Sequence, residues 1–155
     1  MSLSTQPALS FDFELPSTGN KVFRFPNTSG KNLVIYFYPK DDTPGCTTEA
    51  CSMRDARDDI AKLGAEVVGI SMDEAALHER FKAQYKLNFT LLSDPEKKAI
   101  TAYDAWGKKM FGREGILRKT FIIDPQGIVL KVYGRVTPLG HGEQIVHALK
   151  ELQSR

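Results

Sequence analysis

Residues 33–51 read Leu33-Val-Ile-Tyr-Phe-Tyr-Pro-Lys-Asp-Asp-Thr-Pro-Gly-Cys-Thr-Thr-Glu-Ala-Cys51, and this stretch carries most of the information about the architecture. The continuous apolar run over residues 33–38 is typical of a strand that is buried on both faces. Residues 39–45 are rich in proline, aspartate and glycine and predict a loop. The apolar spacing that follows predicts a helix over residues 46–63. A central strand therefore leads through a short loop into a helix, and open α/β sheets bind ligands at this end of their strands.

The rest of the chain alternates strands and helices around this unit. Strict alternation over residues 11–15 and 21–25, on either side of a turn cluster, predicts an opening β-hairpin. Two Ser-x-x-Glu patterns, at residues 71–74 and 93–96, predict capping boxes at the starts of two helices. The other predicted elements are, in order, a strand over 65–71, a helix carrying Leu77, Phe81 and Tyr85, a strand over 90–93, a helix carrying Ala99, Ile100 and Tyr103, a loop over 106–115, strands over 120–123 and 128–133, and a helix over 143–153.

This order of elements predicts an α/β fold. Strands that alternate with helices imply parallel pairs, whereas the tight final hairpin adds antiparallel neighbours. The expected architecture is a mixed central sheet with helices on both faces, as in thioredoxin-like folds, preceded by the N-terminal β-hairpin. A chain of 155 residues is the usual size of one domain, so we expect a single domain over residues 1–155.

Composition excludes several classes of protein. The formal net charge of +2, with the two signs interspersed, gives no field that would follow a nucleic-acid backbone or an anionic membrane. Residues 1–11 lack the basic start and apolar stretch of a secretory signal, and no apolar run approaches the length of a membrane span. We therefore expect a cytoplasmic protein with neither nucleic-acid nor membrane partners. In that compartment its two cysteines are more often reduced, catalytic or metal-binding than structural.

Cys46 lies at the point where the predicted helix begins. Thr43 followed by Pro44 fits an N-cap and a first helical residue, which places Gly45 and Cys46 in the first turn. Backbone N–H groups there lack intrahelical acceptors, and a helix N-terminus stabilises a thiolate, which is the reactive form of cysteine. Most free cysteines are instead small buried hydrophobes. The position directly after a breaker-rich loop favours the reactive interpretation.

Cys51 follows five positions later, and helix geometry makes this spacing informative. In an intact helix the two Cα atoms would be about 8.7 Å apart. That separation exceeds the roughly 7 Å limit for a disulfide. Either the two thiols never bond, or the first turns of the helix unwind. On spacing alone, an idle helix cysteine and a functional thiol are equally good interpretations of Cys51.

Two other classes of function compete with these interpretations. A thiol–disulfide oxidoreductase on the same fold would need Cys-x-x-Cys at the start of the helix, which the spacing here does not provide. A metal-binding or redox-sensing module would combine the two thiols with a histidine, but His78, His141 and His147 have no metal-ligand spacing. Solvated or capping roles are the preferred interpretation of these histidines, and no metal is expected.

The same residues resemble a known family. Pro39, Thr43 and Cys46 fit the Pro-x-x-x-Thr-x-x-Cys signature of peroxiredoxins, and residues 43–51 resemble the bacterioferritin comigratory protein, or peroxiredoxin Q, subgroup. Further matching segments keep the order and spacing of that subgroup, so the resemblance extends over nearly the whole chain. These segments are residues 69–71, 88–94, 106–107 and 115–124.

The resemblance implies an antioxidant thiol peroxidase that reduces hydrogen peroxide and alkyl hydroperoxides without a cofactor. The residue matching Cys46 is the peroxidatic nucleophile, and the thiol matching Cys51 commonly resolves its sulfenic acid as an intramolecular disulfide. The arginine matching Arg118 supports the nucleophile. By itself, a lone arginine before a strand is more often a solvated charge.

The remaining expected site residues surround the substrate. The resemblance implies that Thr43 Oγ and the backbone N–H groups of Gly45 and Cys46 hold the peroxide, and that Pro39 shields the pocket from water. Thr43 also fits a plain N-cap, so both roles stay open. Glu49 is expected to organise the loop, although a first-turn acid favoured by the helix dipole explains it nearly as well.

The resemblance also bears on partners. It implies that a thioredoxin-type dithiol reduces the protein after each cycle. The expected oligomeric state is a monomer, with a weak dimer as the alternative. Trp106, Met110 and Phe111 are interpreted as a hydrophobic patch packed on the core, with a lining of the pocket mouth as the alternative.

Overall fold

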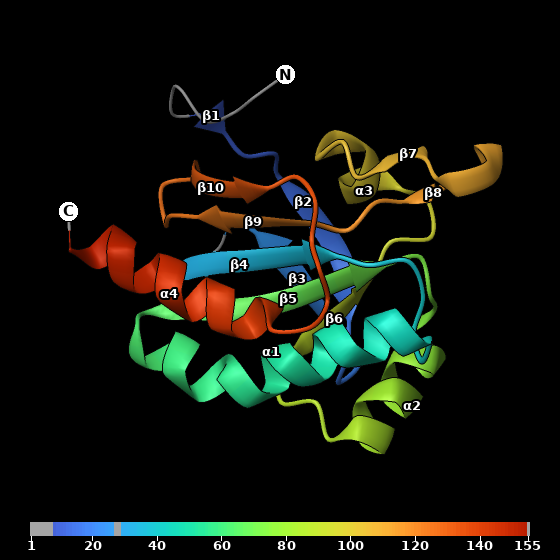
Figure 1. The fold of residues 1–155 in the computed structure, drawn as a ribbon, viewed down its shortest axis with the longest axis horizontal. Helices are drawn as coiled ribbons and strands as arrows, with labels where there is room; N and C mark the ends of the chain where they lie inside the picture. The colour runs from blue at the N-terminus through green and yellow to red at the C-terminus, as the bar shows by residue number, and fades with distance from the viewer. Residues whose placement is uncertain (1–7, 27–28, 155) are drawn as a thin grey trace.

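The structure of this chain is a computed structural model that describes residues 8–26 and 29–154 (Figure 1). Its elements follow one another in the order β1 (Ala8–Leu9), β2 (Phe13–Ser17), β3 (Lys21–Phe25), β4 (Asn32–Phe37), α1 (Pro44–Lys62), β5 (Ala65–Ser71), α2 (Ala75–Tyr85), β6 (Thr90–Ser93), α3 (Lys98–Ala102), β7 (Trp106–Lys108), the 3-10 turn η1 (Met110–Gly112), β8 (Glu114–Ile116), β9 (Lys119–Ile123), β10 (Ile128–Tyr133) and α4 (His141–Gln153).

One mixed sheet organises the described residues. Its strand order is β1-β10-β9-β4-β5-β6-β2-β3, and β7 pairs with β8 in a separate two-stranded sheet. The strands β4, β5 and β6 run parallel, whereas β9 pairs antiparallel with β4 on its other side. Antiparallel pairing of β2 with β3 forms the N-terminal hairpin. The predicted mixed α/β sheet is confirmed.

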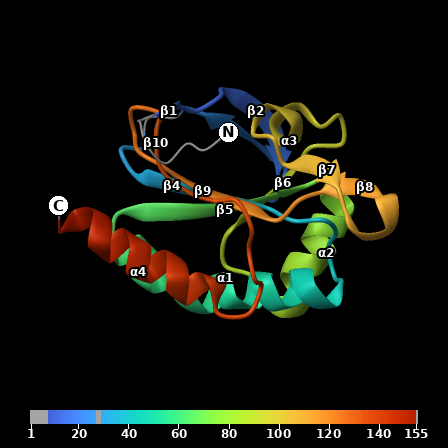
Figure 2. The same cartoon turned by 45° about the horizontal axis from the view of Figure 1, so that its top comes forward.

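Helices cover both faces of this sheet, as Figure 2 shows. On one face α1, α2 and α4 bury a core against the strands, and on the other α3 packs beside the β2–β3 hairpin. The central strand β4 serves both cores, because Val34 and Tyr36 contact the first and Ile35 and Phe37 the second. Full burial of β4 explains its continuous apolar sequence and fixes the direction in which the following loop leaves the sheet.

Several local predictions were wrong in detail. The first hairpin strand, β2, begins two residues later than the predicted start at residue 11. The predicted loop over residues 106–115 contains the β7–β8 pair. Neither capping box forms. The α2 helix begins after Glu74 without a side-chain cap, and α3 is capped by Asp94, whose carboxylate accepts from the N–H groups of Lys98 and Ile100 at 2.8 and 2.9 Å. The carboxylate of Asp94 uses a separate oxygen for each of these two N–H groups, whereas a serine side chain has a single oxygen.

Within residues 8–26 and 29–154, no helix combines the length with the hydropathy needed to cross a bilayer.

Candidate active site

Cys46 lies in the first turn of α1, the helix that follows the carboxyl end of β4. Thr43 occupies the N-cap position with extended backbone, and Pro44 is the first helical residue, as predicted. The thiol is buried, with 1% of the residue exposed. In this first turn the backbone N–H groups have no acceptor within the helix. The sequence therefore places a buried thiol among unpaired donors.

Two donors contact the sulfur directly. The backbone N–H of Lys40 donates to Cys46 Sγ at 3.5 Å, and Arg118 Nη2 donates to it at 3.3 Å. Arg118 directly precedes β9, whose first residue pairs with the last residue of β4, so the sheet register carries the guanidinium to the start of the loop. Both contacts are donors, so they stabilise negative charge on the sulfur.

Arg118 also pairs with a buried carboxyl group. Its Nη1 donates to Glu49 Oε1 at 2.9 Å, so one guanidinium joins Glu49 to Cys46. The Glu49 side chain is completely buried, and within the described residues its other oxygen, Oε2, has no hydrogen-bond partner. Burial raises the pKa of Glu49 from its ordinary value of 4.5 to about 7, and the charge of Arg118 opposes this rise. The site thus contains a carboxyl group that changes charge near neutral pH.

We expect Glu49 to make the stability of the protein depend on pH. The folded state binds the Glu49 proton more tightly than the unfolded chain does. The contribution of protonated Glu49 to the free energy of unfolding is therefore complete below pH 4.5 and is lost as the pH rises through about 7. Glu49→Gln still accepts from Arg118 but does not titrate. Between about pH 4.5 and 8, urea unfolding should show the native protein losing on the order of 3 kcal/mol relative to this variant. Parallel stability curves for the two proteins would contradict the assignment.

Thr43, Gly45 and Pro39 belong to the loop and helix start that carry Cys46. Thr43 is the N-cap residue, but its hydroxyl donates to Lys40 O at 2.8 Å instead of capping the helix, which leaves the Oγ lone pairs as acceptors. A Cβ atom at Gly45 would lie 2.7 Å from Arg118 Nη2, so a larger residue there would displace the guanidinium from its present position. Pro39 is half-buried between β4 and this loop.

Cys51 does not join this group. It lies on the half-buried flank of α1, and both cysteines are free thiols. The helix is continuous from Pro44 to Lys62, so the geometry of an intact helix keeps the two Cα atoms about 8.7 Å apart. The structure therefore describes the reduced, wound form, in which no Cys46–Cys51 bond can form.

The expectation for the histidines was wrong for two of the three. His78 and His141 are buried, with 1% and 0% of each residue exposed, whereas His147 is exposed and contacts Glu151. His78 lies one and two turns before Phe81 and Tyr85 on α2, and this spacing was the available signal for a buried position. Leu77, which belongs to the apolar pattern that predicted this helix, is 40% exposed.

The β7–β8 region differs from the predicted hydrophobic patch packed on the core. Phe111 is 90% exposed, so the expected hydrophobic patch packed on the core does not include it. Trp106 is half-buried, and Lys97 Nζ lies 4.2 Å from its ring centroid. Burial and the neighbouring charge of Arg118 lower the pKa of Lys109, while the charge of Cys46 opposes this shift. Lys109 therefore adds a cation near the thiol.

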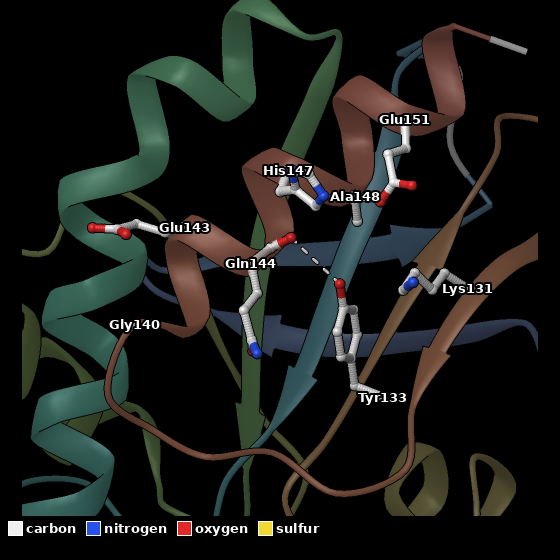
Figure 3. A pocket seen from close by; sticks show the side chains of 8 residues that line it. All are labelled: Lys131, Tyr133, Gly140, Glu143, Gln144, His147, Ala148 and Glu151. Carbon is white, nitrogen blue, oxygen red and sulfur yellow. Dashed lines mark hydrogen bonds and ion pairs between the residues drawn. The ribbon is translucent and has the colours of Figure 1, made fainter.

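A hollow elsewhere on the surface has a different character. It lies between β10 and α4 and is lined by Lys131, Tyr133, Gln144, His147 and Glu151, among others (Figure 3). Tyr133 Oη donates to the Gln144 carbonyl oxygen at 3.4 Å across it. Neither cysteine lines this hollow. The candidate site is therefore the group formed by Cys46, Arg118 and Glu49.

Known proteins share both the sequence and the fold. Residues 7–132 match the AhpC/TSA family. The peroxiredoxin Bcp of Bacillus subtilis strain 168 is 41% identical over 147 residues, which cover 93% of this chain and 94% of that protein. The peroxiredoxin Bcp of Escherichia coli K12 is 37% identical over 142 residues, which cover 90% of this chain and 91% of that protein.

Solved structures agree with these sequence matches. The bacterioferritin comigratory protein of Xanthomonas campestris, studied for its alkyl peroxide reduction activity in trapped intermediate and ligand complexes, superposes with a TM-score of 0.85 at 35% identity, covering 90% of this chain and 91% of that chain. A PrxQ mutant of Xylella fastidiosa superposes with a TM-score of 0.88 at 28% identity, covering 97% and 99% of the two chains.

Proposed function

This chain belongs to the AhpC/TSA family of peroxiredoxins, which are thiol peroxidases, and we propose that it reduces hydrogen peroxide and alkyl hydroperoxides through the thiol of Cys46. The observation that carries the proposal is the pair of donors, Lys40 N–H and Arg118, that converge on Cys46 Sγ. The similar protein of Xanthomonas campestris, with its alkyl peroxide reduction activity, supports this substrate class.

The first step transfers one oxygen atom from the peroxide to the sulfur. The Cys46 thiolate attacks one peroxide oxygen, the O–O bond breaks, and the other oxygen leaves as hydroxide or alkoxide, which takes up a proton to become water or alcohol. Cys46 is left as a sulfenic acid. Arg118 and the first-turn N–H groups stabilise the charge that moves from sulfur to the leaving oxygen.

The surrounding residues hold the peroxide in line with the sulfur. Thr43 Oγ accepts a hydrogen bond from the peroxide, because its own proton is donated to Lys40 O. The N–H groups of Gly45 and Cys46 donate to the peroxide, and Pro39 limits the access of water. Glu49 acts through Arg118, whose guanidinium it orients by the contact between Nη1 and Oε1. Such alignment is a large part of the acceleration that an enzyme provides.

Cys51 resolves the sulfenic acid in the second step. Its thiolate attacks the Cys46 sulfur, a disulfide forms, and the sulfenic oxygen leaves as water. Since a wound helix separates the two residues by about 8.7 Å, the first turns of α1 unwind before this bond forms. A thioredoxin-type dithiol then reduces the disulfide and α1 winds again.

Removing the resolving thiol should separate the two steps. With Cys51→Ser we expect the first reaction with hydrogen peroxide to stay within about threefold of the native rate, since Cys51 does not contact the Cys46 sulfur. Turnover with a dithiol reductant should fall by at least about tenfold, and intact mass spectrometry should show one added oxygen on the oxidised variant. Native turnover by Cys51→Ser would rule out Cys51 as the resolving thiol.

The cellular setting is part of the same proposal. The protein acts as a single domain over residues 1–155, as a monomer in the cytoplasm, with a thioredoxin-type reductant and without a metal or cofactor. Two free cysteines are consistent with a reducing compartment. Sedimentation of the reduced and oxidised protein at several concentrations tests the monomer against a weak dimer.

One experiment tests the proposed function against a thiol–disulfide oxidoreductase and a metal-binding module. The reduced protein is mixed with one equivalent of hydrogen peroxide, and peroxide loss, free thiols and bound metal are followed together. We expect rapid loss of the peroxide and of two thiols per chain, without any change in metal content. Consumption no faster than that by free cysteine would overturn the proposal.

A further inference from the structure

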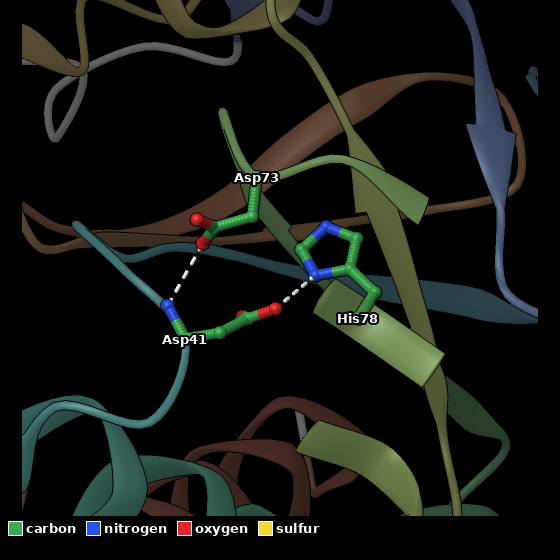
Figure 4. A group of neighbouring side chains, drawn as sticks. All are labelled: Asp41, Asp73 and His78. Atoms are coloured by element: carbon green, nitrogen blue, oxygen red, sulfur yellow. Dashed lines mark hydrogen bonds and ion pairs between the residues drawn. The ribbon is translucent and has the colours of Figure 1, made fainter. Parts of the chain in front are cut away.

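A buried polar cluster lies beneath the loop that carries Lys40. Asp41 and His78 are 8% and 1% exposed, and His78 Nδ1 lies 2.6 Å from Asp41 Oδ2 (Figure 4). The other carboxylate oxygen of Asp41 accepts from Tyr38 Oη at 2.5 Å. The backbone N–H of Asp41 donates to Asp73 Oδ2 at 2.8 Å. Asp41 is thus held by its main chain and by both of its side-chain oxygens.

The contacts of His78 determine how many protons the pair contains. Its Nε2 lies 2.9 Å from the Leu92 carbonyl oxygen, which only accepts, so Nε2 carries a proton. The 2.6 Å contact between Nδ1 and Asp41 Oδ2 requires a second proton between these atoms. Two lone pairs facing each other at that distance would repel. The pair therefore has no net charge, whichever partner holds the shared proton.

The 2.6 Å distance between His78 Nδ1 and Asp41 Oδ2 fits a shared proton and not a metal ion between them. The Asp41–His78 pair is called the anchor below. Ligand atoms from Asp41, Asp73 and His78 all lie within 4.8 Å of one another. Two ligands of one tetrahedral zinc, each about 2.0–2.1 Å from the metal, are roughly 3.3 Å apart. His78 Nδ1 and Asp41 Oδ2 are closer than that, and Asp73 Oδ2 already accepts from Asp41 N–H and Ser71 Oγ. A proton satisfies these contacts.

The anchor acts on the backbone that faces the thiol. Lys40 donates its N–H to Cys46 Sγ, and its carbonyl accepts from Thr43 Oγ1. The following peptide unit leads to Asp41, whose N–H and side chain are fixed by the cluster. The Lys40 side chain is exposed, so its own packing does not set the direction of its backbone N–H.

We propose that His78 is a positioning residue for peroxide reduction, because through Asp41 it fixes the Lys40 backbone whose N–H donates to Cys46 Sγ. The inference rests on Cys46 being the reacting thiol, as proposed above. A hydrogen bond to a charged group that is lost from the thiolate should lower the rate of the first step by about 10–100-fold.

The test compares variants that remove the anchor with one that preserves its shape. His78→Leu leaves Asp41 without its partner, and we expect the second-order rate constant for hydrogen peroxide to fall by about 10–100-fold. Asp41→Asn keeps both side-chain contacts, since its amide oxygen accepts from Tyr38 and its NH₂ donates to the unprotonated Nδ1 of a neutral His78. We expect this variant to stay within about threefold of the native rate.

A loss of stability by itself must not produce the same result. Ile100→Ala removes a fully buried side chain on the opposite face of the sheet, so it lowers the melting temperature without touching the Lys40 loop. We expect its rate constant to remain native. Should His78→Leu not fold, the half-buried Asp73 offers the matched pair Asp73→Ala and Asp73→Asn, of which only the alanine variant loses the acceptor for Asp41 N–H and about tenfold in rate.

The outcomes separate this inference from the proposed function. If the native protein shows no fast reaction with hydrogen peroxide, the proposed function fails. If the native protein reacts fast and folded His78→Leu or Asp73→Ala reacts equally fast, the positioning role alone is overturned. An Asp41→Asn rate as low as that of His78→Leu would also overturn it, because charge and not position would then control the thiol.

Discussion

Cys46→Ser is expected to lower the second-order rate constant for hydrogen peroxide by at least about 10³-fold. A serine hydroxyl is a weak nucleophile unless a neighbouring base takes its proton. Both groups that contact the Cys46 sulfur, the Lys40 N–H and the Arg118 guanidinium, are donors and cannot act as that base. The site is therefore built to stabilise an anion that already exists, which suits a thiolate and not a hydroxyl.

The measurement is stopped-flow oxidation of the reduced protein under an excess of peroxide, read as the loss of free thiols and of peroxide. Cys51→Ser is the matched control, since it also exchanges one cysteine of α1 for serine but leaves the donors around Cys46 intact. We expect that control to keep the first-step rate. A Cys46→Ser protein that consumed peroxide within tenfold of the native rate would place the chemistry elsewhere.

Arg118→Met should lower the same rate constant by about 100–1,000-fold, the usual cost of removing one preorganised donor from a charge that moves in the transition state. Methionine keeps much of the length and apolar stem of the side chain but loses both of its contacts, to Cys46 Sγ and to Glu49 Oε1. Arg118→Lys keeps the charge without the planar fork that reaches two partners. We expect the lysine variant to recover only part of the rate.

The two contacts of Arg118 can be separated by a second substitution. Arg118→Met leaves the buried Glu49 without its cation, so its pKa should rise further and the variant should lose stability most strongly at alkaline pH. Adding Glu49→Gln removes that buried charge. We expect the double variant to regain stability but not the peroxide rate. An Arg118→Met protein that reduced hydrogen peroxide within threefold of the native rate would show that Arg118 does not take part in peroxide reduction.

Local signals were sufficient to predict the position of Cys46. The apolar run of β4, the breaker-rich loop after it and Pro44 at the start of α1 are neighbours in sequence, and each acts on the conformation of the next few residues. The predicted helix over residues 46–63 begins two residues after the observed start of α1 at Pro44. Cys46 was placed in the first turn for the same reason.

Long-range pairing could not be predicted from the same patterns. Glu49 and Arg118 are 69 residues apart, and the register of β9 against β4 brings them together. The resemblance to peroxiredoxins indicated a role for Arg118. Nothing in the sequence around Arg118 indicated that it pairs with the buried carboxyl group of Glu49. The spacing of His78 on α2 indicated a buried position, but its partner Asp41 belongs to a loop 37 positions earlier, and no local pattern pairs the two.

The bond between Cys46 and Cys51 is the most direct test of the proposed mechanism. The reduced protein is treated with one equivalent of hydrogen peroxide, its remaining thiols are alkylated, and the unfolded chain is digested with trypsin and a glutamate-specific protease, which cleaves at Glu49 between Cys46 and Cys51. We predict two peptides joined by a disulfide, with no alkylated cysteine. Separate peptides that each carry an alkylated thiol would contradict both the nucleophile and the unwinding of α1.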